Sequence, residues 1–346
     1  MPISREQEFF IQWHLTERCN LRCSHCYQTG GRSDELELSE INDVVSEVSG
    51  MLRAWTAEYG IPFSPSFNIT GGEPLLRQDL FAVLDAVRAS GFDTFLLTNG
   101  TLITAEKAKH LAALAVKGVQ VSIEGPEMVH DSIRGKGSFA ASLKGIRHLL
   151  DAGLPVTINA TLSEINAARF PDMVELAVSL GVQRLGFSRL VPSGRGRELI
   201  GRMMPAERVA EVYREIMSLS EDGLDIVTGD PVASQLSVSA DADSGPVARS
   251  GCAAGISGLT FLPDGAIVPC RRLFVPIGNV RTDSIREVWS SSPVLNALRE
   301  RSGYKGKCGS CKRWADCRGC RAIAYAYSCS MGKDDFLAED PQCFIE

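Results

Sequence analysis

Three cysteines lie close together near the N-terminus, at Cys19, Cys23 and Cys26, with the spacing C-x3-C-x2-C. Three thiolates on one short loop can bind three irons of a cubic [4Fe–4S] cluster, which leaves the fourth iron without a protein ligand. A structural zinc site is the alternative, but such a site takes four protein ligands, commonly as two C-x2-C pairs. His25 could be the fourth ligand only by straining a loop that both neighbours already tie. The spacing therefore favours a cluster with one open iron.

Eight more cysteines follow in the last third of the chain. They are Cys252, Cys270, Cys308, Cys311, Cys317, Cys320, Cys329 and Cys343. The first residues are charged and contain no apolar signal region. Eleven cysteines without a secretion signal indicate metal ligands in a reducing compartment, not a disulfide framework, so we expect a cytoplasmic protein.

Composition excludes several classes of function. The chain has 346 residues, of which 44% are hydrophobic and 23% charged, so it can bury a full core. The formal net charge of −6 gives no global basic field that would favour nucleic acid. No apolar run approaches the length of a membrane span.

Strand and helix patterns alternate from the start of the chain and predict the elements that must position these cysteines. The expected strands cover Glu8–Leu15, Phe67–Thr70, Thr94–Thr98, Val119–Glu124, Pro155–Leu162 and Arg184–Leu190. The expected helices cover Leu38–Tyr59 with Ser39 as N-cap, Asp79–Ser90, Thr104–Lys117, Ser138–Ala152, Pro171–Leu180 and Pro205–Leu219. Such βα repeats require a parallel sheet with helices outside it. We predict a partial (βα)6 barrel, with functional loops at the C-terminal ends of its strands.

Candidate binding residues follow these strands. A G-G-E-P run with Gly71, Gly72 and Glu73 comes directly after the second strand, where glycines permit close backbone approach and Glu73 supplies an acceptor. Asn99 follows the third strand, Ser122 ends the fourth, and Arg134 comes a few residues later. Asn159 on the fifth strand, and Arg189 and Leu190 at the end of the sixth, are weaker candidates. From the residues alone, Ser122 could equally be a capping serine and Arg134 a solvated side chain.

The cysteine triplet, followed after one βα unit by G-G-E-P, resembles the signature of the radical S-adenosylmethionine (SAM) enzymes. The resemblance implies that the methionine end of SAM chelates the open iron. It also implies that Gly71, Gly72 and Glu73 hold the SAM ammonium group, and that Asn99 lines the pocket. Ser122 would contact the ribose or carboxylate, and the arginine fork of Arg134 would suit the carboxylate.

The last third of the chain is similar to the SPASM extension of these enzymes, which carries two auxiliary [4Fe–4S] clusters. The resemblance implies a barrel over residues 1–223, a linker over 224–250 and a Cys-rich SPASM domain over 251–346. One departure from the family is the final C-x2-C of the core spacing, where C-x3-C is usual. Counting the radical cluster, we expect three [4Fe–4S] clusters.

The resemblance also assigns the auxiliary ligands. Cys308, Cys311, Cys317 and Cys343 would hold the second auxiliary cluster, and Cys252, Cys270 and Cys320 the first. The family often has a further cysteine where this chain has Gly258. Either Cys329 supplies the fourth bond, which a two-turn helix after Cys320 would permit and which we favour, or the first auxiliary cluster keeps an open iron. Cys329 could also be an ordinary buried thiol.

For function, the resemblance implies a radical SAM/SPASM maturase that forms a thioether cross-link, or makes a related oxidation, in a ribosomally synthesised precursor peptide. Flavodoxin or ferredoxin would be the reductant. Because the barrel begins so near the N-terminus, leader recognition would use the barrel and SPASM surfaces or a separate leader-binding protein. The alternatives are a tetrapyrrole side-chain-modifying enzyme of heme biosynthesis, and a maturase of a metal-cofactor oxidoreductase. Arg271 and Arg272 stand where the sulfatase-maturing branch has an aspartate, which disfavours formylglycine formation.

Overall fold

The computed structural model describes residues 7–28, 30, 34–236 and 248–345. Its strands are β1 Gln7–His14, β2 Phe63–Thr70, β3 Asp93–Thr98, β4 Gly118–Ser122, β5 Val156–Leu162, β6 Arg184–Arg189, β7 Asp225–Thr228, β8 Gly258–Phe261, β9 Ala266–Val268 and β10 Gly278–Asn279. Its α-helices are α1 Leu38–Tyr59, α2 Leu80–Ala89, α3 Ala105–Ala113, α4 Glu127–Arg134, α5 Ser138–Asp151, α6 Phe170–Leu180, α7 Ala206–Ser218, α8 Ile285–Ser291, α9 Pro293–Arg299, α10 Gly306–Ser310 and α11 Arg321–Ser330.

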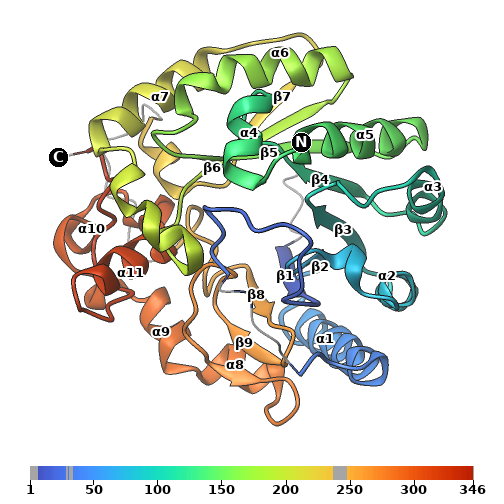
Figure 1. Ribbon diagram of the computed structural model, residues 1–346. Helices are drawn as coiled ribbons and strands as arrows, with labels where there is room; N and C mark the ends of the chain where they lie inside the picture. The colour runs from blue at the N-terminus through green and yellow to red at the C-terminus, as the bar shows by residue number, and fades with distance from the viewer. Residues whose placement is uncertain (1–6, 29, 31–33, 237–247, 346) are drawn as a thin grey trace.

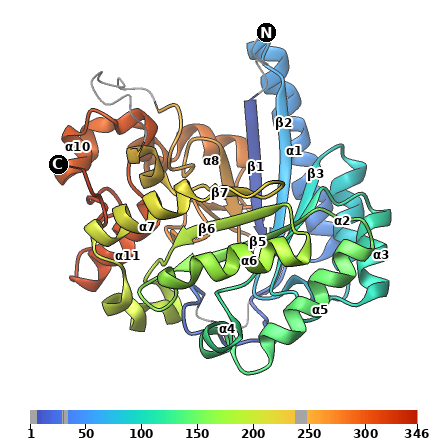
Figure 2. The same cartoon turned by 90° about the horizontal axis from the view of Figure 1, so that it is seen from above.

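One sheet joins all the strands of the described residues, in the order β10-β9-β8-β1-β2-β3-β4-β5-β6-β7. The strands from β8 to β7 in this order are parallel to their neighbours, and β9 and β10 are antiparallel. Helices surround the curved sheet, and the C-terminal helices lie between α7 and α1 (Figures 1 and 2). The predicted α/β fold with six βα units is confirmed. None of the helices in the described part of the chain is long and apolar enough to cross a membrane.

The parallel strands are buried against the helices, as their apolar residues require. On β5, for example, Val156, Ile158, Ala160 and Leu162 are buried, and the residues between them are partly exposed. A two-residue period directs alternate side chains to opposite faces of the sheet. One face of β5 therefore packs into the core, and the other is available to the space inside the barrel.

Two local predictions need correction. Helix α1 begins at Leu38 as expected, but its N-cap is Glu37 instead of Ser39, because the backbone N–H of Glu37 donates to the Glu40 carboxylate at 2.7 Å. Strand β2 begins at Phe63, four residues earlier than expected, in spite of Pro65. The pairing with β3 begins only at Ser66, so the missing N–H of Pro65 costs no bond to β3. Helix α4 was not predicted.

The predicted linker, residues 224–250, does not begin as a linker. Strand β7 lies within it and pairs with β6 along Asp225–Thr228, and residues 237–247 lie outside the described residues. Strand β8 pairs with β1, so the SPASM segment extends the barrel sheet. Gly258 starts β8, and a Cβ there would lie 2.2 Å from the Phe10 carbonyl oxygen. This close approach explains why position 258 holds glycine and not a cysteine.

Arg189, a weaker candidate for the site, instead joins distant segments of the chain. Its guanidinium is fully buried and binds Asp230 at 2.7 and 2.8 Å and Asp340 at 2.8 and 3.0 Å. Asp230 follows β7, and Asp340 lies near the C-terminus. This buried ion cluster fixes the last segment of the chain against the end of β6.

Candidate functional site

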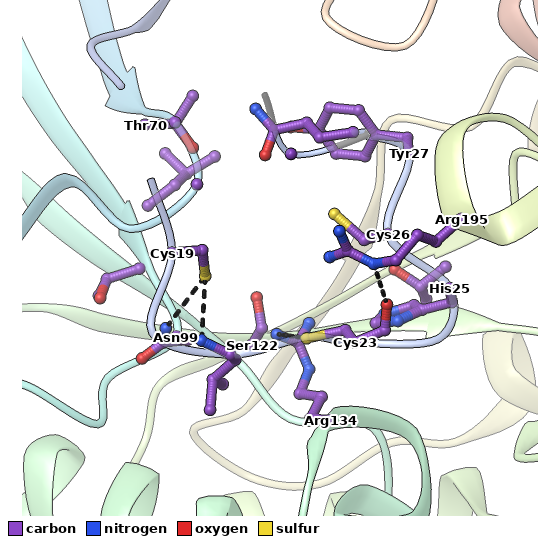
Figure 3. A pocket seen from close by; sticks show the side chains of 18 of the residues that line it. Cys19, Cys23, His25, Cys26, Tyr27, Thr70, Asn99, Ser122, Arg134 and Arg195 are labelled. Atoms are coloured by element: carbon purple, nitrogen blue, oxygen red, sulfur yellow. Dashed lines mark hydrogen bonds between the residues drawn. The ribbon is translucent and has the colours of Figure 1, made fainter. Parts of the chain in front are cut away.

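A cavity of about 510 Å³ lies at the C-terminal ends of the barrel strands. The predicted residues that line it are Cys19, Cys23, Cys26, Gly71, Gly72, Asn99, Ser122, Arg134 and Asn159. Figure 3 shows the three sulfur atoms directed into one space, with Asn99, Ser122 and Arg134 on one side and Tyr27 on the other. The structure therefore brings together the cysteine triplet and most of the predicted SAM contacts.

The two glycines let the G-G-E-P loop dock on the cysteine loop. The N–H of Gly72 donates to the Thr16 carbonyl at 2.7 Å, and the N–H of the next residue, Glu73, donates to the Arg18 carbonyl at 2.8 Å. A Cβ on Gly71 would lie 2.5 Å from the Thr16 oxygen, and one on Gly72 would lie 2.3 Å from the Arg18 oxygen. Only glycine permits this approach, so the pair positions the cysteine loop as well as lining the cavity.

Glu73 does not line the cavity. Its carboxylate is fully buried and accepts from the Thr98 hydroxyl at 2.8 and 2.9 Å, the Asn99 N–H at 2.9 Å and the Leu75 N–H at 3.1 Å. Burial raises the pKa of Glu73, although these hydrogen bonds oppose the shift. The expected contact between this side chain and SAM is therefore replaced by a structural role, in which Glu73 orients Asn99. The Asn99 amide donates to Asn20 at 2.9 Å and lies 4.0 Å from the Cys19 sulfur.

Glu124 is a site residue that the sequence analysis gave no role. Its buried carboxylate lies 3.0 Å from His25 Nε2, 2.9 Å from Arg134 Nε and 2.8 Å from the Thr161 N–H. Arg134 in turn lies 3.9 Å from the Cys23 sulfur. Burial would raise the pKa of Glu124, but Arg134 and His25 outweigh it and hold that pKa well below its usual range. Glu124 thus links the cysteine loop to the barrel, and part of the Arg134 fork is already occupied.

Of the two remaining candidates, Asn159 on β5 lines the cavity, and Leu190 directly after β6 does not. Asn159 lines the cavity, and a Cβ at position 186 would lie 2.6 Å from its Oδ1, so Gly186 leaves room for this side chain. Leu190 is buried in the core and does not line the cavity, which its neighbours Ser188 and Val191 do. Arg195 was also missed. It donates to the Cys23 carbonyl at 3.0 Å from the 3-10 helix Gly194–Arg202, which the sequence analysis did not predict.

The donor set around the first cavity fits an iron–sulfur cluster. Three thiols from one loop face the same space, and burial raises the pKa of Cys19 to about 11 and also raises that of Cys23. Metal ligands of this kind must lose their protons, so cluster binding at this loop would release protons. In the part of the chain described, no three His, Cys, Asp or Glu side chains are placed to hold a single metal ion. Cys19, Cys23 and Cys26 would hold the radical cluster.

A second cysteine site lies around another cavity, of about 440 Å³. Its lining includes the four predicted ligands Cys308, Cys311, Cys317 and Cys343. Polar hydrogens point at these sulfurs, as N–H groups do around thiolates. Gln235 Nε2 lies 3.4 Å from Cys343 Sγ and 3.6 Å from Cys317 Sγ, and an Arg321 nitrogen lies 3.5 Å from Cys308 Sγ. These four residues suit the second auxiliary cluster.

The structure does not bring Cys329 to the thiols assigned to the first auxiliary cluster. Cys320 and Cys270 both lie near Arg272, and Cys252 lies near Cys320. Cys320 caps the N-terminus of α11, and Cys329 lies nine residues on, about 13 Å along the helix axis. The Cys329 thiol instead lies 3.4 Å from Asp334 and lines a third cavity. The predicted helix forms, but it separates Cys329 from Cys320.

Comparison with known protein families agrees with both cysteine sites, the N-terminal loop and the C-terminal cysteine cluster. Residues 13–177 match the radical SAM superfamily, and residues 252–321 match the SPASM iron–sulfur cluster-binding domain. An AdoMet-dependent heme synthase of Methanosarcina barkeri is 33% identical over 96% of this chain and 95% of its own length. The mycofactocin maturase MftC of Mycobacterium tuberculosis is 31% identical over 96% of this chain and 82% of its own length.

Solved structures show the same fold. Streptococcus suis SuiB bound to S-adenosylmethionine superposes with a TM-score of 0.75 at 17% identity, covering 98% of this chain and 78% of that one. The radical SAM domain accounts for SAM and the first [4Fe–4S] cluster, and the SPASM domain for further iron–sulfur binding. The chain belongs to the radical SAM enzymes that carry a C-terminal SPASM domain.

Proposed function

We propose that this enzyme is a maturase that modifies a ribosomally synthesised peptide, by a thioether cross-link or a related oxidation. The observation that carries this proposal is a third cavity, of about 860 Å³, which adjoins the radical-cluster cavity. The two cavities share Glu17, Tyr27, Gln28 and Arg272 in their linings. A substrate larger than SAM could therefore lie in the third cavity with one side chain beside the cysteine loop.

The lining of the third cavity suits a peptide. Polar side chains such as Ser193, Asp264 and Asp334 alternate with apolar ones such as Leu262 and Phe274. Pockets for mixed ligands combine an apolar wall with a few polar groups that fix orientation. The polar groups could bind the peptide backbone while the apolar ones hold its side chains.

When bound, the cluster and SAM would supply the radical chemistry that removes a hydrogen atom from the substrate. The residues of this chain position that chemistry. The docked loops of Gly71 and Gly72 and the Glu124 network fix the cysteine loop in one place. The cysteine loop thereby presents its three thiols to the cavity at the strand ends.

The relatives support the proposal, but they include both peptide-modifying enzymes and heme synthases, so they do not separate it from the tetrapyrrole alternative. MftC is named a mycofactocin maturase, and a PqqA peptide cyclase of Methylocella silvestris is 32% identical over 96% of this chain. The heme synthases match at 30–33% identity, which favours tetrapyrrole side-chain modification as the second candidate. The rings of Tyr27 and Phe274, which line the third cavity with centroids 6.4 Å apart, could also pack against one face of a planar macrocycle. Maturation of a metal-cofactor oxidoreductase stays a prediction.

The partners of the reaction follow from this proposal. Flavodoxin or ferredoxin would supply the electron, and a separate protein could present the leader of the precursor peptide. A cytoplasmic location would keep the cysteine ligands reduced.

The test uses anaerobically reconstituted enzyme with SAM and a chemical reductant. One set of reactions contains candidate precursor peptides encoded near this gene, and the other contains a propionate-bearing tetrapyrrole. Mass spectrometry of the substrate and chromatography of 5′-deoxyadenosine report the outcome. A mass change in a peptide, with matching 5′-deoxyadenosine, would support the maturase. A change only in the tetrapyrrole would replace it with the second candidate.

A further inference from the structure

Two consecutive arginines, Arg271 and Arg272, lie on a tight turn that lines the radical-cluster cavity. The N–H of Leu273 donates to the Cys270 carbonyl at 2.9 Å, which makes Arg271 and Arg272 the central residues of the turn. Both side chains line the cavity of about 510 Å³, and Arg272 also lines the third cavity. The turn therefore places two positive charges where the cavities meet.

Neither guanidinium has a carboxylate partner within the described residues. Arg272 makes only long contacts, 3.4 Å to the Ser188 hydroxyl and 3.5 Å to the Arg189 carbonyl, and its buried Nε has no partner. Arg271 makes no hydrogen bond or ion pair with any part of the chain that the structure describes. Asp230, which lies near Arg272, is occupied by Arg189.

Two adjacent positive charges without a carboxylate partner are costly in a partly enclosed site. Arg272 lies near the Cys270 and Cys320 thiols, but both arginines also line the cavity, where no carboxylate of the described residues pairs with them. Two other lining arginines are better satisfied: Arg134 binds Glu124, and Arg195 binds the Cys23 carbonyl. An anion from outside the protein would offset the repulsion at the turn and accept several charge-assisted hydrogen bonds.

That anion should belong to the substrate. In radical SAM enzymes the methionine end of SAM is committed to the open iron of the cluster, and the turn lies where the substrate cavity joins that site. We propose that Arg271 and Arg272 bind a carboxylate of the substrate and so select an acidic substrate, either a peptide carboxylate or a tetrapyrrole propionate. This inference rests on the proposed function only for the identity of the molecule that bears the carboxylate.

The binding test uses the cluster-loaded enzyme with SAM and two pairs of probes. One pair is mesoporphyrin IX and its dimethyl ester, and the other is the peptide acetyl-AAAAAF as the free acid and as the amide. In at least one pair the acid should bind roughly ten- to a hundred-fold more tightly than its neutral partner. Arg271→Gln should remove this preference, and Arg271→Lys should restore part of it. Arg214→Gln is the matched control, since it removes the same charge from an exposed residue that lines neither cavity.

A second measurement does not depend on the choice of probe. Phenylglyoxal labelling followed by peptide mass spectrometry should modify Arg271 faster than the paired Arg134, and the tighter acid should slow it. Equal binding of acid and neutral forms in both pairs would overturn the proposal, as would slow labelling of Arg271. If Arg271→Gln weakens SAM binding and keeps the acid preference, the turn serves SAM instead. Failure of the proposed function is distinct, because it would appear as a wild-type enzyme that modifies no peptide, whatever its preference between acid and neutral probes.

Discussion

Cys329 shows how a single residue can be misassigned by counting ligands. Eleven cysteines divide neatly into one set of three and two sets of four, and this arithmetic favoured Cys329 as the last ligand. The structure gives its thiol another partner, Asp334, and another location, the third cavity. The first auxiliary cluster would then have three cysteine ligands, Cys252, Cys270 and Cys320.

Removing Cys329 should therefore leave the clusters intact. We expect Cys329→Ala to retain about twelve irons per chain after reconstitution, because three four-iron clusters keep their ligands. Cys320→Ala is the control, and it should lose about four irons because a buried ligand is missing. Iron analysis and the visible absorbance of both variants make the comparison. Equal losses in the two variants would restore Cys329 as a ligand.

Glu124 should be important for stability. Its carboxylate is fully buried and binds Arg134, so Glu124→Gln would leave a buried guanidinium without its counter-charge. Breaking such a pair typically costs about 3–5 kcal/mol of unfolding free energy. Because the pKa of Glu124 is lowered, this stabilisation is present at neutral pH and is lost only as the pH falls through that lowered pKa.

Urea unfolding at neutral pH measures the effect of Glu124→Gln. Arg88→Gln provides a control, since the ion pair between Arg88 and Asp85 is exposed and should contribute less than about 1 kcal/mol. A loss at Glu124 no larger than the loss at Arg88 would show that the network does not hold the cysteine loop.

At the scale of elements, the G-G-E-P loop and the cysteine loop form one unit. We expect Gly72→Ala to push the loops apart, because its Cβ would lie 2.3 Å from the Arg18 carbonyl oxygen. The radical cluster should be lost, with a fall of about four irons, while the auxiliary clusters remain. Gly50→Ala in α1 is the matched substitution, since nothing lies within 4 Å of its Cβ. It should stabilise the protein by about 0.5–1 kcal/mol. Full iron content in Gly72→Ala would contradict the docking argument.

The elements themselves were largely predictable, and the site only in part. The periodic pattern of apolar residues identified the strands and helices of the βα units, and the spacing C-x3-C-x2-C identified the cysteine loop. Glu73 was placed in the cavity because sequence shows which residue follows a strand but not which way its side chain turns. Strand β7 was read as linker because four residues carry too little periodicity. The role of Glu124 comes from a hydrogen bond to Thr161, which lies far from it in the chain, and Arg271 lines the cavity although it is distant in sequence from the cysteine loop. No local sequence pattern records either placement.

At the scale of the molecule, Arg189 joins the barrel to the C-terminal segment. Its buried guanidinium satisfies Asp230 and Asp340 together. Arg189→Met should leave two buried carboxylates unpaired and lower the unfolding free energy by about 3–5 kcal/mol. Limited proteolysis should then cleave the C-terminal segment first. Arg184→Met on the same strand removes only an exposed pair with Asp225, and should leave the protease pattern unchanged. Identical patterns for the two variants would refute this role.

The two cysteine regions should have separate roles: the N-terminal triplet is expected to serve SAM cleavage, and the C-terminal cysteines are expected to hold the auxiliary clusters. The triple variant Cys19→Ala, Cys23→Ala, Cys26→Ala should keep about eight irons of about twelve and make no 5′-deoxyadenosine, because the thiols of the first cavity are gone. A variant with Cys308→Ala and Cys311→Ala should also keep about eight irons, yet still cleave SAM, since its lost site lies around a separate cavity. Iron analysis and product chromatography on both proteins separate the two sites. Persistent 5′-deoxyadenosine in the triple variant would refute the radical-cluster assignment. Zinc in place of iron in the wild type would refute the auxiliary clusters.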